Sequence, residues 1–321
     1  MRDHGGDIDR ARAETGFEGD WIDLSTGINR RPWPAPPPSA HALQALPTRA
    51  DTARLVTAAA AFLGTRPDRL LPLAGASAAI ALLPRLVPGR RASVLAPSYN
   101  EHAASLRAHG WQLTEAPRAR DLAGDLAVLV NPNNPDGREW SPPAIAEIAG
   151  RVGHLIVDES FADPRPDLSV VPLDLPNVTV LRSFGKFWGL AGLRLGLVAG
   201  DPGLLARLAA EAGPWPVSGP ALEIGAAAYA DRPWAEATTT WLAEAALELD
   251  RIVTGAGWRP VGGTHLFRLY ETPDAAAAQA RLARAGIWAR IFPWHPRWIR
   301  LGIPGNGSEF DRLARTLGTA R

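Results

Sequence analysis

Between residues 70 and 199, short apolar runs alternate with segments of helical pattern. This alternation is typical of parallel strands joined by helices, because a parallel connection needs a dozen or more residues. We therefore expect a three-layer α/β fold: a mainly parallel sheet with helices on both faces and a ligand at the carboxyl ends of the strands. The expected strands are 70–73, 93–96, 126–130, 154–158, 178–183 and 193–199, and the expected helices are 76–87, 101–109 and 142–151.

Prolines divide the chain into three parts. Five of them lie between residues 30 and 38, and since proline fixes φ and removes an amide donor, this segment is interpreted as an extended connector. Pro214 and Pro216 interrupt the pattern again, ahead of two helical stretches over 221–256. We expect an N-terminal arm and linker over 1–40, a large domain over 41–215 and a small C-terminal α/β domain over 216–321. The small domain should hold strands at 265–270, 288–292 and 298–303 and helices at 275–285 and 309–317.

Composition and charge exclude several classes of function. The 321 residues carry 34 Lys+Arg against 33 Asp+Glu, a net charge of +1, so nucleic acid and anionic membranes are not expected partners. The absence of cysteine excludes disulfides, zinc–thiolate sites, iron–sulfur clusters and thiol nucleophiles. We find neither a signal peptide nor a membrane helix in the sequence and expect a cytoplasmic protein. Its chemistry must come from Lys, His, carboxylates, hydroxyls or a cofactor, and no metal site is expected.

The segment 183–196, SFGKFWGLAGLRLG, is the most informative for chemistry. Lys186 follows an expected strand and stands between glycine and aromatic residues. Partial burial would destabilise its ammonium form and leave a neutral amine for Schiff-base chemistry. Ser183 and Arg194 could hold a phosphate through charge-assisted hydrogen bonds. A lone lysine is usually a surface residue, so the flanking pattern is what favours a functional one.

Three further strand ends carry polar or small residues. Asn134 lies in the sequence NPNNPDG, and Asp158 ends an apolar run. Gly75, Ala76 and Ser77 open a helix with backbone N–H groups that suit a phosphate. Taken singly, these segments would be a tight turn, a helix cap and a helix start. At one edge of a single sheet they would form one binding site.

In their order and spacing these motifs resemble those of the aspartate-aminotransferase-like superfamily, the fold type I enzymes that use pyridoxal 5′-phosphate (PLP). The resemblance covers about residues 20–317; Asn134 and Asp158 are 24 residues apart, Asp158 and Lys186 are 28 apart, and Lys186 and Arg194 are eight apart. It implies a fold type I large domain, a smaller C-terminal domain, an N-terminal arm and a homodimer.

The resemblance also implies roles for the residues of a cofactor site. Lys186 would form the Schiff base with PLP and later move protons. Asp158 would keep the pyridine nitrogen protonated, so that the ring accepts electrons from the substrate. Asn134 would donate to the phenolic oxygen. The remaining cofactor contacts are expected from Gly75, Ala76 and Ser77, with Ser183 and Arg194, at the phosphate, and from Tyr99 stacked on the ring, unless Tyr99 is a core residue.

Within the superfamily the chain resembles the branch of histidinol-phosphate aminotransferases and cobalamin-pathway threonine-phosphate decarboxylases. The sequence HGGD at 4–7 is similar to the decarboxylase arm, and LSTGIN at 24–29 to a segment whose asparagine meets the substrate. Phe161 stands where aminotransferases of this branch carry a tyrosine, as it does in the decarboxylases. Leu46-Pro47 replaces the usual Tyr-Pro, which puts one phosphate contact in question.

The resemblance therefore implies a PLP-dependent decarboxylase that converts L-threonine O-3-phosphate to (R)-1-aminopropan-2-yl phosphate in cobalamin biosynthesis. A small phosphorylated amino acid would be held by His4, Asn29, Arg290 and Arg300, since arginine binds carboxylate or phosphate in bidentate fashion. Solvated strand arginines are the alternative for the last two. A histidinol-phosphate-type aminotransferase would use the same residues, and sequence alone leaves both activities open. A non-catalytic PLP-fold binding protein is the third interpretation.

Overall fold

A computed structural model describes residues 4–319, and in it the chain forms two compact units. The first unit comprises the described residues up to Pro32, the short segment Pro135–Gly137 and the chain from Glu236 onward. The second unit comprises Trp33–Asn134 and Arg138–Ala235. Within residues 4–319, no helix combines the length and the apolar character that crossing a membrane requires.

The second unit is built on a seven-stranded mixed sheet. Its strands are β2 (Leu70–Leu73), β3 (Arg91–Leu95), β4 (Gln112–Ala116), β5 (Leu126–Val130), β6 (His154–Asp158), β7 (Val178–Ser183) and β8 (Gly196–Ala199). They lie in the order β2-β8-β7-β6-β5-β3-β4. Strands β3 to β7 run parallel to one another, whereas β8 is antiparallel to both of its neighbours. The carboxyl ends of β5, β6 and β7 therefore meet at one edge.

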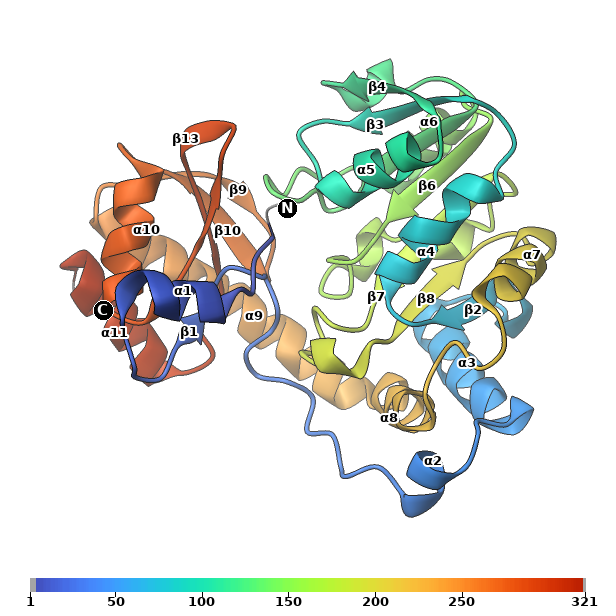
Figure 1. Ribbon diagram of the computed structural model, residues 1–321, viewed down its shortest axis with the longest axis horizontal. Helices are drawn as coiled ribbons and strands as arrows, with labels where there is room; N and C mark the ends of the chain where they lie inside the picture. The colour runs from blue at the N-terminus through green and yellow to red at the C-terminus, as the bar shows by residue number, and fades with distance from the viewer. Residues whose placement is uncertain (1–3, 320–321) are drawn as a thin grey trace. The chain divides into compact units, whose positions relative to one another are not determined.

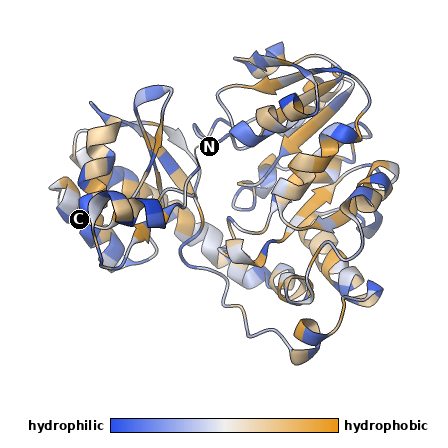
Figure 2. Cartoon of the chain, viewed as in Figure 1, coloured by the Kyte–Doolittle hydropathy of each residue, from blue (hydrophilic) through white to orange (hydrophobic). Residues whose placement is uncertain are grey.

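The central strands are continuous apolar runs because both faces of the sheet are covered. All residues of β5 are buried, and so are four of the five residues of β6. Figure 2 shows hydrophobic residues along these strands. The expected three-layer α/β fold is thus confirmed.

Helices lie on both faces of this sheet (Figure 1). Three of them share one apolar core with the strands, in which Ile80, Leu106 and Leu205 pack with Val128 and Ile156. These are α4 (Ala76–Leu82), α5 (Asn100–Ala108) and α7 (Pro202–Ala212). The other helices of the unit are α2 (Ala40–Gln44), α3 (Arg49–Leu63), α6 (Pro142–Ala149) and α8 (Gly219–Ala230).

The first unit contains a four-stranded antiparallel sheet and a separate parallel pair of strands. The sheet consists, in spatial order, of β12 (Arg290–Phe292), β13 (His295–Gly302), β10 (Phe267–Glu271) and β9 (Arg259–Gly263), and the pair of β1 (Ile22–Asp23) and β11 (Ile287–Trp288). Its helices are α1 (Ile8–Thr15), α10 (Ala275–Arg284) and α11 (Gly307–Leu317), with most of α9 (Arg232–Gly255).

The N-terminal segment contains a helix that the sequence analysis did not expect. Asp7 caps α1 by accepting a hydrogen bond from the Arg10 backbone N–H at 3.0 Å. Ala11 is fully buried and packs in a cluster with Ala283 and Trp288. The arm is therefore anchored on the first unit.

The boundaries of the two compact units differ from the domain boundaries expected at residues 40 and 215. Residues 216–235 belong to the second unit, because α8 packs against α3. Residues 33–40 belong to it as well, and the Trp33 backbone N–H donates to the Trp188 carbonyl at 2.9 Å. Whether the chain divides into folding domains at residues 40 and 215 stays a prediction.

Candidate active site

A cavity that is partly open to solvent lies in the second unit at the carboxyl ends of β5, β6 and β7. Such an edge is where ligands bind in open α/β sheets. The residues expected around a cofactor all line this cavity: Gly75, Ala76, Ser77, Tyr99, Asn134, Asp158, Ser183, Lys186 and Arg194. The structure thus brings them together, while their individual roles stay predictions.

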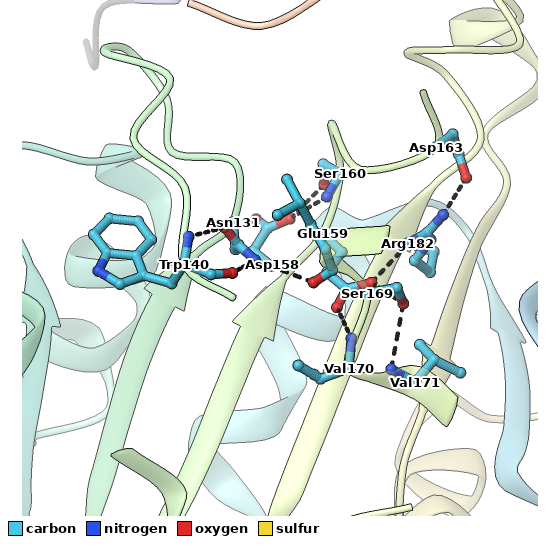
Figure 3. A network of polar contacts seen from close by, with 11 residues as sticks. Asn131, Trp140, Asp158, Glu159, Ser160, Asp163, Ser169, Val170, Val171 and Arg182 are labelled. Carbon is cyan, nitrogen blue, oxygen red and sulfur yellow. Dashed lines mark hydrogen bonds and ion pairs between the residues drawn. The ribbon is translucent and has the colours of Figure 1, made fainter. Parts of the chain in front are cut away.

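Asp158 is held as a carboxylate at the floor of this cavity. Burial by itself would raise the pKa of Asp158, but hydrogen bonds from His102 and Ser160 outweigh it and keep that pKa below its ordinary value. His102 Nε2 lies 2.8 Å from Asp158 Oδ2. The Ser160 backbone N–H and hydroxyl donate to Oδ1 at 3.0 and 2.5 Å (Figure 3). At neutral pH this group can therefore accept a hydrogen bond from a protonated nitrogen.

The sequence analysis missed His102 and Ser160. A carboxylate can only accept hydrogen bonds, so the buried His102 ring must donate through Nε2. The available signal was its spacing from Tyr99, because residues three apart share one face of a helix. The two rings are in edge-to-face contact, with centroids 6.0 Å apart. Ser160 follows Asp158 by two residues, the spacing of an Asx turn.

Lys186 is the only lysine in the sequence. It follows β7 in a tight turn, in which its carbonyl accepts a hydrogen bond from the Gly189 N–H at 3.2 Å. Its Nζ lies 5.5 Å from the centroid of the Phe161 ring. The flanking Phe184 and Phe187 are buried, which fixes the turn on both sides of the lysine. An aldehyde entering this cavity would meet the one side-chain amine that the chain offers.

The part of the cavity lined by Gly75, Ser77 and Arg194 is suited to an anion. Arg194 Nη2 donates to the Ser77 hydroxyl at 3.0 Å, beside the start of α4, which has no side-chain cap. Gly75 has a φ of +84° and a ψ of 161°, a backbone conformation that favours glycine. Arg194 is exposed rather than buried, as a cation that receives a ligand from solvent can be. The residues present therefore fit a phosphate group.

A buried ion network joins the end of β7 to the segment that follows β6 (Figure 3). Arg182 precedes Ser183 on β7, and successive side chains of a strand point to opposite faces. Its Nη1 donates to Glu159 at 2.7 Å, and its Nη2 pairs with Asp163. Burial raises the pKa of both carboxyls in spite of the arginine. Glu159 also accepts hydrogen bonds from the Ser169 hydroxyl and the Val170 N–H, each at 2.7 Å.

The residues expected to bind substrate lie in the first unit. His4 and Arg290 line one cavity there, together with Ser25. Arg300 is buried, faces Arg290 in the register of β12 and β13, and donates to the Ser25 carbonyl at 2.6 Å. Burial and the neighbouring Arg290 lower the pKa of Arg300 to about 9. Two adjacent cations of this kind would be stabilised by an anion.

Asn29 and Leu46 are placed differently. The Asn29 side chain is buried and its Oδ1 accepts the Arg31 backbone N–H at 2.9 Å, which is the contact of a turn. Leu46, where the branch usually has tyrosine, is 63% exposed between α2 and α3. Because His4, Asn29, Arg290 and Arg300 belong to one unit and Lys186 to the other, their convergence on one pocket stays a prediction.

The mixed sheet, with a lysine, an aspartate and an asparagine at its strand ends, is the architecture of the fold type I transferases. The family described as "Aminotransferase class I and II" matches residues 20–317, and the chain belongs to this family. It is 41% identical over 324 residues to a threonine-phosphate decarboxylase of Sinorhizobium sp., with 98% of this chain and 97% of the relative covered. It is 40% identical over 332 residues to a threonine-phosphate decarboxylase of Pseudomonas aeruginosa, with 99% and 97% covered.

Among solved structures, the chain is similar to a histidinol-phosphate aminotransferase from Sinorhizobium meliloti, determined in complex with pyridoxal-5′-phosphate. The TM-score is 0.83 at 21% sequence identity, over 96% of this chain and 93% of that one. This similarity confirms the fold.

Proposed function

We propose that the chain is a PLP-dependent decarboxylase that releases CO₂ from L-threonine O-3-phosphate. The observation that carries the proposal is the cavity in which the only lysine shares its walls with Asp158, Asn134 and an anion-binding end. The similarity to two threonine-phosphate decarboxylases over nearly the full chain supports the choice of substrate and reaction.

In this proposal, each group of PLP would have a partner among the residues that line the cavity. The Asp158 carboxylate would accept a hydrogen bond from the protonated ring nitrogen. The Asn134 amide would donate a hydrogen bond to the phenolic oxygen. Ser77 and Arg194, hydrogen-bonded to each other, would take the phosphate. Tyr99 would lie against the ring. When bound, PLP supplies an electron sink that lets a bond at the substrate Cα break.

Lys186 has two tasks in this proposal. Its Nζ would hold the cofactor, because a side-chain amine can react with an aldehyde. The same amine, in its protonated form, would supply the proton that the substrate Cα takes up in place of CO₂. Which bond at Cα breaks depends on which one stands perpendicular to the ring, so the substrate carboxylate must be oriented by other residues.

Arg290 and Arg300 are proposed to orient the two anionic groups of the substrate. The lowered pKa of Arg300 reflects burial and repulsion by Arg290, and both effects would be offset by a bound carboxylate or phosphate. His4 lines the same cavity as Arg290 and would add a contact from the arm. Asn29 is kept as a fourth substrate residue on the resemblance alone.

We further propose a homodimer that works in the cytoplasm and supplies aminopropanol phosphate for cobalamin synthesis, as the resemblance implies. Light scattering on the purified protein tests the dimer. A monomer at working concentrations would contradict it.

The deciding experiment compares two reactions of the purified, PLP-loaded protein. With threonine phosphate we expect stoichiometric release of CO₂; with histidinol phosphate and 2-oxoglutarate we expect no glutamate. The opposite result would establish the aminotransferase in place of the decarboxylase.

Borohydride reduction tests the cofactor separately. It should attach one pyridoxyl group per chain, on Lys186, and Lys186→Ala should abolish both the attachment and turnover. A protein that takes up no PLP would refute the cofactor, and with it the proposed enzyme.

A further inference from the structure

We propose that Gly262 and Gly137 are positioning residues for Asn134, acting through a glycine seam in which the backbone at 136–137 packs directly on the backbone at 262–263. The inference rests on the proposed function, in which the Asn134 amide contacts the cofactor. It concerns how that amide is held, because Asn134 lies in a loop rather than in a strand or helix.

The base of the Asn134 loop is fixed in the second unit. Asn131 and Trp140 exchange two hydrogen bonds, from the Asn131 amide to the Trp140 carbonyl and from the Trp140 N–H to Asn131 Oδ1, each at 3.0 Å (Figure 3). The Asn133 N–H donates to the Arg138 carbonyl at 2.8 Å, and its side-chain amide donates to the Pro97 carbonyl at 3.0 Å. One end of the loop is thus tied to the sheet edge.

The tip of the loop, Pro135–Gly137, belongs to the first unit. A Cβ on Gly137 would lie 2.2 Å from the Gly263 carbonyl oxygen, and a Cβ on Gly262 would lie 2.1 Å from the Asp136 carbonyl oxygen. Both distances are far below van der Waals contact with backbone atoms that cannot turn aside. The two backbones can therefore approach this closely only where neither carries a side chain.

A turn would explain a glycine at position 137, but it would not explain the glycine at position 262. Gly137 has a φ of +72°, so a turn alone would favour glycine there. Gly262 lies in β9 outside the left-handed region, and nothing in its own conformation requires glycine. The pairing of β9 with β10 shifts at this point, with Gly262 opposite Leu269 and Pro260 opposite Tyr270. Such an irregularity bends a strand locally and can bring its backbone onto a neighbour.

Asn134 consequently lies between two constrained neighbours in the chain. Asn133, on one side, is tied to Pro97. On the other side, Pro135 has a restricted φ and leads into the seam. A hydrogen bond from a side-chain amide weakens steeply with a few tenths of an ångström or with misalignment, so a loop residue that must donate needs both supports. Loss of the seam should loosen Asn134 while leaving Asp158 at the end of β6 and Lys186 in the turn after β7.

Gly262→Ala is the principal test, with Gly255→Ala as its matched control. Gly255 is in the same unit, and a Cβ there would meet nothing closer than 3.4 Å. In the cofactor-free proteins, hydrogen exchange of residues 131–140 should rise about tenfold or more in Gly262→Ala and stay unchanged in Gly255→Ala. Equal exchange in the two variants would overturn the seam. Thermal unfolding verifies that both variants are folded.

The second readout is the pH at which the visible absorption of the PLP-loaded protein changes. A donor to the phenolic oxygen weakens the hold of that oxygen on the neighbouring proton, so a loosened Asn134 should raise the midpoint by about 0.5–1 pH unit. Asn134→Ala should raise it as well, and Gly262→Ala should add nothing further in that background. A full additional shift would show that Gly262 acts elsewhere and would overturn the proposal.

The two proposals fail in distinguishable ways. A wild-type protein that binds no PLP refutes the proposed function, while the exchange measurement still decides on the seam. Should Gly262→Ala fail to fold, Gly137→Ala tests the same contact from the other side. Its control is Gly257→Ala, since Gly257 also has a positive φ, of +82°, but nothing within 4 Å of its would-be Cβ.

Discussion

Replacing Arg182 by methionine would leave two buried carboxylates without their cation. Glu159 is fully buried, and Asp163 is 6% exposed; both pair with this one guanidinium. Removing one partner from a buried ion network costs about 3–5 kcal/mol, because the charges that remain can neither be hydrated nor neutralised by a counterion. The free energy of unfolding of a typical domain is about 5–15 kcal/mol, so the variant should lose a large part of its stability.

The assay is urea unfolding of the cofactor-free protein, followed by tryptophan fluorescence and extrapolated to zero denaturant. The control is Arg251→Met, whose exposed ion pair with Glu248 should leave the unfolding midpoint unchanged within error. A third protein, Arg182→Met combined with Glu159→Gln and Asp163→Asn, removes all three charges. It should regain most of the lost stability, since a neutral replacement of a buried ion network is often close to neutral in free energy.

The stability of Arg182→Met should also depend on pH, in a direction set by the pKa values of the two carboxyls. The ordinary pKa values of Glu159 and Asp163 are 4.5 and 3.8, and burial raises both in the folded state. Without Arg182 they rise further, so the folded protein binds protons that the unfolded chain does not. The stability of Arg182→Met is therefore greatest at acid pH and falls as pH rises from these ordinary values through the raised folded values. A deficit of less than about 1 kcal/mol, or one that does not grow between pH 5 and pH 8, would refute this reasoning.

Three further substitutions test the sites directly. His102→Phe removes a hydrogen bond that lowers the pKa of Asp158, so the acid limb of the kcat/KM profile should move to higher pH; an unchanged profile would mean that His102 only packs. Arg194→Ala should raise the Kd for PLP about tenfold or more, as measured by equilibrium dialysis, and equal retention would remove Arg194 from the phosphate site. Arg300→Ala should raise the KM for threonine phosphate about 30-fold or more without altering the spectrum of bound PLP, and a normal KM would leave Arg300 a structural residue.

Much of the large sheet could be predicted because its central strands are buried on both faces. The segments 126–130, 154–158 and 178–183 are observed as β5, β6 and β7 at those residues. The edge strand β4 was missed, since Gln112, Thr114 and Glu115 are exposed and produce no apolar run. A strand at the edge of a sheet is determined by its pairing with β3, which no local pattern records.

The candidate site shows the same division between local and distant information. Asp158 could be found because it ends an apolar strand, and Lys186 and Asn134 because each lies a few residues after one. His102 could not be assigned a role, because its partner Asp158 is 56 residues away. In the sequence, Glu159 and Asp163 follow Asp158 in what could be a solvated acidic turn. The structure shows that both are buried, because Arg182 on the neighbouring strand pairs with them. Pairings of this kind arise from tertiary packing.

The single lysine has a practical consequence for work with this protein. Its other permanently charged basic side chains are all arginines, which do not react readily with aldehydes or activated esters. Apart from an α-amino group, an amine-directed fluorescent label therefore has one target, and that target lies in the cavity. The extent of labelling at Lys186 would therefore measure the fraction of cavities without a ligand. Immobilisation on a sensor surface through lysine would have to be replaced by an affinity tag.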